Sequence, residues 1–304
     1  MSEGHGPGSN GPEPGPDIRR VGVVGCGLMG AGIAEICARA GLDVVVHEVN
    51  AGTAETGRAR ITASLDRGVR RGKLSDAERR AALDRVRVST DLMELADRDL
   101  VVEAATEDEK VKVELFAELD RVVTREDALL ASNTSSLPIM KLGMATTRPH
   151  QVIGVHFFNP VPVLKLVEIV PSLLTAHQTQ FRAEDFVTAV LGKTVIRAQD
   201  RAGFVVNALL VPYLLSAIRM LESGHASAED IDTGMVLGCA HPMGPLSLAD
   251  LIGLDTLTAI AEAMYADFKD PLHAPPPLLL RMVEAGLLGR KSRRGFHDYS
   301  PKGD

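Results

Sequence analysis

A glycine-rich turn lies between a short apolar run and a helix-forming segment near the start of the chain. The apolar run, residues 21–25, predicts a buried strand, and residues 31–40 predict a helix. Gly25 allows a tight turn, Gly27 lets the backbone approach a pyrophosphate, and Gly30 lets helix and strand pack closely. The pyrophosphate lies at the helix N-terminus, where N–H groups and the dipole favour an anion. Three glycines spaced G-x-G-x-x-G between a strand and a helix match the dinucleotide-binding fingerprint. The alternative is a plain glycine-rich turn.

The second apolar run, residues 44–48, ends on Glu48, which follows Gly30 by 18 positions. A carboxylate at this place accepts hydrogen bonds from the adenosine ribose and repels a 2′-phosphate, so the sequence predicts NAD rather than NADP. A solvated strand-end charge is the alternative, and the nearby Arg58 and Arg60 leave the binding of a 2′-phosphate open. We interpret Cys26 in the turn as a small residue that fits there rather than as a reactive thiol.

Strands and helices alternate over the first two thirds of the chain. Further short apolar runs predict strands at 99–103, 128–131, 152–156 and 165–170, with a helix at 109–122 and two helices within 51–88. Alternation of this kind predicts parallel βαβ units with right-handed crossovers. After residue 203 there is little strand signal, and helices are expected at 203–223, 227–238, 246–266 and 276–287.

The expected fold is therefore an α/β Rossmann-type N-terminal domain with a mostly parallel sheet, followed by an all-α C-terminal domain. We place the first domain at residues 18–200 and the second at 201–304. Residues 1–17 hold five Gly and four Pro and are predicted to be a disordered tail. The apolar helices of the C-terminal domain exceed what one small domain readily buries, which predicts a homodimer through that domain.

Composition excludes several classes of function. The net charge of −7 and an aromatic content of 4% without Trp argue against nucleic-acid binding. The most apolar stretch, residues 203–221, contains Pro212 and Arg219 among other interruptions, so no membrane span is predicted. The three cysteines have no metal-ligand spacing and fit a reducing cytosol, so we expect no metal site and a cytoplasmic protein.

His156 and Glu168 lie symmetrically about Pro162 in a segment of two apolar runs. If these runs fold back as a pair, the two side chains come close. A carboxylate beside a histidine stabilises the imidazolium and fixes the tautomer, which suits a general base near neutral pH. A purely structural hydrogen bond between the two residues in the core is the alternative.

Two further clusters carry weaker signals. The run Ser132 to Ser136 follows a predicted parallel strand, where open α/β sheets bind ligands, although such a run is commonly a turn or helix cap. Basic residues gather at Arg67, Arg70, Arg71 and Lys73. They form either a solvated helix face or a local anion site for substrate phosphates.

Together these motifs resemble the L-3-hydroxyacyl-CoA dehydrogenases, and among them the short 3-hydroxybutyryl-CoA dehydrogenases of actinobacteria. The similarity covers residues 20–299 and rests on six segments: the glycine-rich turn, Val102 to Ala104, Ala131 to Ser136, His156 to Val163, Gly203 to Asn207, and His241 to Asp255. Two departures occur near the C-terminus, where Arg293 replaces a family Gly and His297 a Tyr. They put local packing in doubt, not the chemistry.

The resemblance implies roles for individual residues. The catalytic pair falls on His156 and Glu168, with Ser135 and Asn207 binding the acyl part of the substrate. Contacts to NAD fall on Gly25, Gly27, Leu28, Met29, Gly30, Glu48, Ala104, Glu107, Lys112 and Asn159. Contacts to coenzyme A fall on Ser64 and Arg71.

The implied reaction is NAD-dependent oxidation of a (3S)-3-hydroxyacyl-CoA, with 3-hydroxybutyryl-CoA as the expected substrate, or the reverse reduction of acetoacetyl-CoA. Two alternatives stay open. One is the same chemistry on an acyl group held by a carrier protein of a secondary-metabolite pathway. The other is an NAD-binding regulator without catalysis, which the retained His156 and Glu168 argue against.

Overall fold

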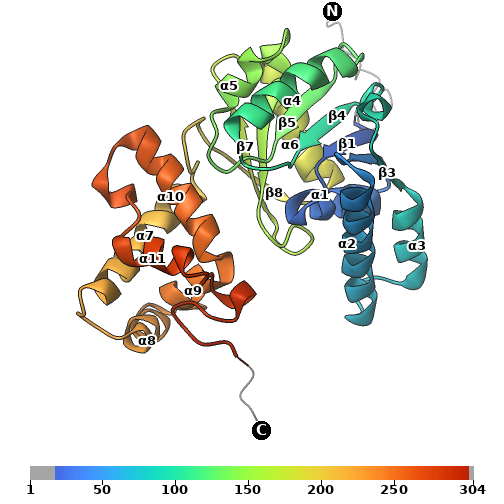
Figure 1. The fold of residues 1–304 in the computed structure, drawn as a ribbon. Coiled ribbons are helices and arrows are strands. Elements are labelled where there is room, and N and C mark those ends of the chain that lie inside the picture. Colours follow the sequence, from blue (N-terminus) through green and yellow to red (C-terminus); the bar gives the residue numbers. More distant parts are fainter. Residues whose placement is uncertain (1–17, 301–304) are drawn as a thin grey trace, which may run out of the picture. The chain divides into compact units, whose positions relative to one another are not determined.

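The computed structural model describes residues 18–300, and the predicted tail, residues 1–17, lies outside them. By contacts, the described chain forms two compact units. The first unit holds most of the chain up to residue 196. The second holds the residues from 197 onward and two short segments, 134–141 and 170–173. The first is a sheet with helices and the second is helical (Figure 1). The predicted division at residues 200 and 201 stays a prediction.

The first unit is built on one sheet of eight strands in the order β3-β2-β1-β4-β5-β6-β7-β8. The strands are β1 Arg20–Val24, β2 Asp43–His47, β3 Val86–Ser89, β4 Leu100–Glu103, β5 Leu129–Ser132, β6 Val152–Phe157, β7 Leu166–Pro171 and β8 Thr194–Arg197. The neighbours from β3 through to β6 are paired in parallel. This arrangement confirms the predicted Rossmann-type fold with a mostly parallel sheet.

Helices connect these strands. They are α1 Leu28–Arg39, α2 Ala51–Arg70, α3 Asp76–Asp84, α4 Glu109–Val122, α5 Ile139–Met144 and α6 His177–Asp185. Helix α1 packs on β1 and β2 and also contacts α2 and α3. Asn50 caps α2 by accepting from the Thr53 N–H, and Ser75 and Glu78 form a capping box at the start of α3. The side chains of Val21, Ile33 and Val44 are fully buried between α1 and the sheet.

Two strands were not predicted, β3 and the short strand β8 at Thr194–Arg197. Residues 51–88 were expected to be helical, but Val86–Ser89 form β3 and pair in parallel with β2, Val86 opposite Val44. Val86 is buried and Arg87 exposed, which is the alternation of an edge strand. Four residues directly after a helix carry too little periodicity to reveal this, and pairing with β2 decides the structure.

The second unit contains the helices α7 Val206–Glu222, α8 Ala228–Cys239, α9 Pro245–Ile252, α10 Leu254–Phe268 and α11 Pro277–Glu284. Its core includes Leu214, Leu246 and Leu257. The all-α character of this region is as predicted, but the single helix expected over 246–266 is divided. Gly253 has φ of 100°, which interrupts the helix between α9 and α10 because L-residues rarely adopt that conformation. Within residues 18–300, no helix combines the length and the apolar character needed to cross a membrane.

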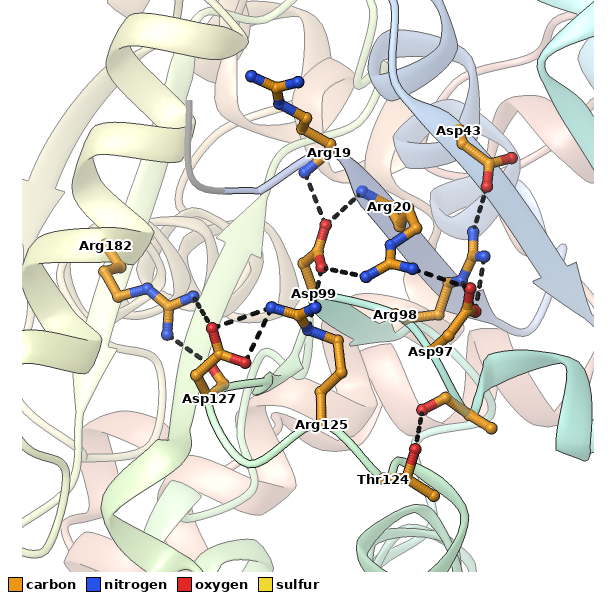
Figure 2. A network of polar contacts seen from close by, with 11 residues as sticks. Arg19, Arg20, Asp43, Asp97, Arg98, Asp99, Thr124, Arg125, Asp127 and Arg182 are labelled. Carbon is orange, nitrogen blue, oxygen red and sulfur yellow. Dashed lines mark hydrogen bonds and ion pairs between the residues drawn. The ribbon is translucent and has the colours of Figure 1, made fainter. Parts of the chain in front are cut away.

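An ion-pair network holds the start of β1 against the start of β4 (Figure 2). Asp99, 5% exposed, accepts hydrogen bonds from the backbone N–H groups of Arg19 and Arg20 at 2.9 and 2.7 Å. The guanidinium groups of Arg20 and Arg125 lie 3.2 and 3.1 Å from its other oxygen. Burial alone would raise the pKa of Asp99, but the bonds from Arg19 and Arg20 outweigh it and lower that pKa.

We expect Asp99→Asn to lower the free energy of unfolding at pH 7 by about 1–3 kcal/mol, because buried donors lose a charged acceptor. The pKa of Asp99 is lower in the native state than in the unfolded chain. The contribution of Asp99 to the free energy of unfolding is therefore complete above the unfolded pKa of about 4. It is lost as the pH falls through the native pKa. Urea unfolding of both proteins as a function of pH checks this. If the difference in unfolding free energy between the two proteins stayed the same at acid pH, the prediction would be wrong.

Candidate active site

The glycine-rich turn has the backbone geometry that its sequence predicts. Gly25 follows β1 with φ of 89°, and α1 begins at Leu28, three residues before the predicted start. A Cβ atom on Gly30 would lie 1.9 Å from the carbonyl oxygen of Gly25. The residue must be glycine for α1 to pack this close to the turn. The turn therefore places the N-terminus of α1 at the carboxyl end of β1, where a phosphate group is stabilised.

A cavity of about 1010 Å³ opens beside this turn. Of the residues predicted to contact NAD, Gly25, Gly27, Leu28, Met29, Glu48 and Ala104 line it, whereas Gly30, Glu107, Lys112 and Asn159 do not. The lining also includes Thr90 to Met93, which follow the unpredicted strand β3. Sequence reasoning missed this part of the lining because it missed the strand. The alternation of Val86 and Val88 with polar neighbours was the only signal for it.

Glu48 follows β2 directly, and its carboxylate is already engaged with the turn. Its Oε1 accepts a hydrogen bond of 2.5 Å from the Cys26 N–H, and the Arg60 guanidinium donates to the Cys26 carbonyl at 2.5 Å. Arg60 is therefore held at the phosphate turn, whereas Arg58 is exposed on α2. Burial and the charge of Glu48 raise the pKa of the Cys26 thiol to about 12, against the opposite effect of Arg60. The thiol is protonated at neutral pH, in agreement with its interpretation as a small buried residue.

These features fit NAD. The turn has the positive φ and the glycine at Gly30 that the fingerprint requires, the cavity is large enough for a dinucleotide, and a carboxylate lies on its wall. The assignment of Gly25 to Met29 to the pyrophosphate and of Glu48 to the adenosine ribose stays a prediction.

We expect a higher kcat/KM with NADH than with NADPH, by about tenfold or more, because Glu48 repels a 2′-phosphate. Glu48→Gln should narrow this preference for NADH, because it removes the negative charge that repels the 2′-phosphate. Equal kcat/KM values for the two cofactors in the wild-type protein would show that Arg60 or Arg58 already accepts the 2′-phosphate.

His156 and Glu168 lie side by side on strands β6 and β7, which are neighbours in the sheet. The Nδ1 atom of His156 is 2.7 Å from Oε2 of Glu168, and the two side chains are 5% and 0% exposed. The ring of Phe158 meets the imidazole edge-to-face at 4.7 Å. With Nδ1 held by a carboxylate, Nε2 is the nitrogen suited to exchange a proton with a substrate hydroxyl. The fold thus brings the predicted pair together.

The predicted substrate-contacting residues are divided between the two units. Ser135 and Asn207 belong to the second unit, where the Gly203 N–H donates to the Ser135 carbonyl at 3.3 Å and Asn207 lies in the first turn of α7. Ser64 is half-buried on α2, and Arg71 is exposed at the C-cap of the same helix. Their contacts with substrate and coenzyme A stay predictions.

Comparison with known proteins shows the family. The model "3-hydroxyacyl-CoA dehydrogenase, NAD binding domain" matches residues 20–201, and the model of that family's C-terminal domain matches residues 203–299. The chain therefore belongs to the 3-hydroxyacyl-CoA dehydrogenase family, and it is an NAD-dependent oxidoreductase.

Individual relatives are similar over nearly their whole length. A 3-hydroxybutyryl-CoA dehydrogenase of Mycobacterium tuberculosis is 60% identical over 93% of this chain and 99% of the relative. The human mitochondrial hydroxyacyl-coenzyme A dehydrogenase is 43% identical, over 93% and 91%. The crystal structure of (S)-3-hydroxybutyryl-CoA dehydrogenase from Ralstonia eutropha superimposes with a TM-score of 0.88 at 46% identity, covering 93% and 100%. The sequence-based resemblance is confirmed.

Proposed function

We propose that this protein oxidises (3S)-3-hydroxybutyryl-CoA to acetoacetyl-CoA and catalyses the reverse reduction. The observation that carries the proposal is the buried His156–Glu168 pair, 2.7 Å apart, in the same unit as the NAD cavity. The names of relatives at 60% and 45% identity, both 3-hydroxybutyryl-CoA dehydrogenases, support the four-carbon substrate.

NAD supplies the hydride chemistry when bound. His156 accepts the proton of the 3-hydroxyl during oxidation and returns it to the 3-oxo oxygen during reduction. Glu168 stabilises the imidazolium and fixes the ring so that Nε2 faces the substrate. Ser135 and Asn207 hold the acyl oxygens in a reactive orientation. Ser64 and Arg71 bind coenzyme A, with the Arg71 guanidinium suited to a bidentate phosphate contact.

The substrate carrier is tested by steady-state rates of NADH oxidation on acetoacetyl-CoA and on the same acyl group held by a carrier protein. We expect a kcat/KM higher by about tenfold or more for the coenzyme A thioester, because its 3′-phosphoadenosine portion, which carrier-bound phosphopantetheine lacks, offers the basic cluster around Arg71 additional phosphate. A preference for the carrier thioester would instead identify the protein as a dehydrogenase of carrier-bound acyl groups in a secondary-metabolite pathway.

We further propose that the protein acts in the cytoplasm as a homodimer joined through the C-terminal helices. Leu214 and Leu215 are buried in the core of the second unit, so they do not supply the interface. Leu209 on α7 and Leu237 on α8 are 75% and 79% exposed and are better candidates. Sedimentation at micromolar concentration should give about twice the chain mass of 32.5 kDa. A monomer under these conditions would refute the dimer.

A further inference from the structure

A buried carboxylate lies at the carboxyl end of β4, next to the NAD cavity. Glu103, the last residue of β4, is 0% exposed. Its Oε1 accepts from the Ala105 N–H at 2.7 Å and from Lys112 Nζ at 2.6 Å. Its Oε2 accepts from the Ser132 hydroxyl at 2.7 Å, and Ser132 ends the neighbouring strand β5. Both carboxylate oxygens are thus satisfied within the fold.

Burial of this ion pair is costly, which makes its location informative. Lys112 is 1% exposed, so both charges have left water, and such a pair seldom stabilises a fold more than apolar side chains would. The carboxyl ends of strands are where open α/β sheets bind their ligands. Lys112 Nζ also lies 3.2 Å from Oε2 of Glu107, whose side chain is 40% exposed. Lys112 therefore links the buried carboxylate to one at the surface.

On one side, Glu103 fixes the wall of the NAD cavity. Ala104, Ala105 and Thr106 line that cavity, and the bond from the Ala105 N–H to the Glu103 carboxylate sets the path of this loop. Glu103 itself is not among the lining residues. It acts on the cavity only through this loop.

On the other side, the main chain of the same residue is connected to the strand that carries His156. The Glu103 carbonyl accepts from the Asn133 N–H at 2.8 Å. Oδ1 of Asn133 then accepts from the Phe157 N–H at 2.9 Å, and Phe157 is the neighbour of His156 on β6. A continuous set of buried hydrogen bonds thus joins the ends of β4, β5 and β6.

We propose that Glu103 is a positioning residue whose carboxylate fixes the NAD-cavity wall against the end of β5, through Ala105, Lys112 and Ser132. The inference rests on the proposed function, and it adds a residue to which the sequence assigned no role. Its negative charge is required because it must hold the Lys112 ammonium while it accepts from Ala105 and Ser132.

The test is NADH binding by fluorescence titration, which needs no turnover and so stays decisive even if the proposed substrate is wrong. Glu103→Gln keeps the shape and removes the charge. We expect the Kd for NADH to rise about tenfold or more, the size expected for loss of a hydrogen bond between charged groups. Ser132→Ala removes one donor without adding volume and should raise the Kd by a smaller factor, and it decides the question if Glu103→Gln does not fold.

Asp99→Asn is the matched control. Asp99 directly precedes β4, at the opposite end from Glu103, and is likewise a nearly buried carboxylate with several N–H donors (Figure 2). The Asp99→Asn variant should have a lower melting temperature and an unchanged Kd for NADH. The proposal is overturned if folded Glu103→Gln and Ser132→Ala proteins bind NADH as the wild type does. It is also overturned if Asp99→Asn weakens binding as much, because the effect would then be general loss of stability.

Discussion

Replacement of His156 by alanine is expected to lower the kcat of acetoacetyl-CoA reduction by about 10²–10⁴-fold, the usual contribution of general acid–base catalysis. The alanine has no group that can give a proton to the 3-oxo oxygen. NADH binding should be unchanged, since His156 does not line the NAD cavity. Steady-state kinetics with a parallel NADH titration measures both quantities.

Two further variants test the partner of His156 and provide a control. Glu168→Gln keeps the shape beside Nδ1 but removes the charge, so kcat should fall because the imidazolium loses its anionic partner. His177→Ala, at an exposed histidine that begins α6, should behave as wild type. A near wild-type kcat for His156→Ala would mean that the buried pair is structural.

Gly30→Ala is expected to abolish measurable NADH binding and to destabilise the first unit by several kcal/mol, about the upper end of overpacking effects or beyond. The new Cβ would lie 1.9 Å from the Gly25 carbonyl oxygen and 2.9 Å from its carbon. Both are backbone atoms, so no rotamer relieves the clash, and the phosphate turn must move. Thermal melting and NADH titration measure the two effects.

Gly27→Ala provides the contrast. A Cβ at Gly27 meets nothing within 4 Å, so this variant should melt close to the wild type. Its binding of NADH should still weaken, because Gly27 is the position where the backbone approaches the pyrophosphate. A Gly30→Ala protein that melts and binds as the wild type does would refute the placement of the cofactor on this turn.

The parts of the fold that the sequence predicted are those with a strong local signal. The strand, turn and helix around Gly25 to Gly30 were predicted because glycine spacing and apolar runs are read locally. The Rossmann-type sheet followed from the alternation of strands and helices. Strand β3 was missed because four residues after a helix become a strand only by pairing with β2. The break at Gly253 was missed because an isolated glycine is tolerated inside many helices.

The sequence predicted some residues of the candidate site and missed others, because only some of them have a local signal. His156 and Glu168 were paired on symmetry about Pro162, and the structure brings them to 2.7 Å. Glu103 was seen only as part of a motif, because its role depends on Ser132 and Lys112, which are distant in sequence and come together only in the folded sheet. Contacts of this kind have no periodicity that a sequence displays.

The central claim is tested most directly by the rate of NADH oxidation with 3-oxoacyl-CoA thioesters from four to sixteen carbons. Steady turnover is predicted, with the highest kcat/KM on acetoacetyl-CoA and a decline as the chain lengthens. Binding of NADH without turnover on any of these thioesters would contradict the claim and identify the protein as a nucleotide-binding regulator.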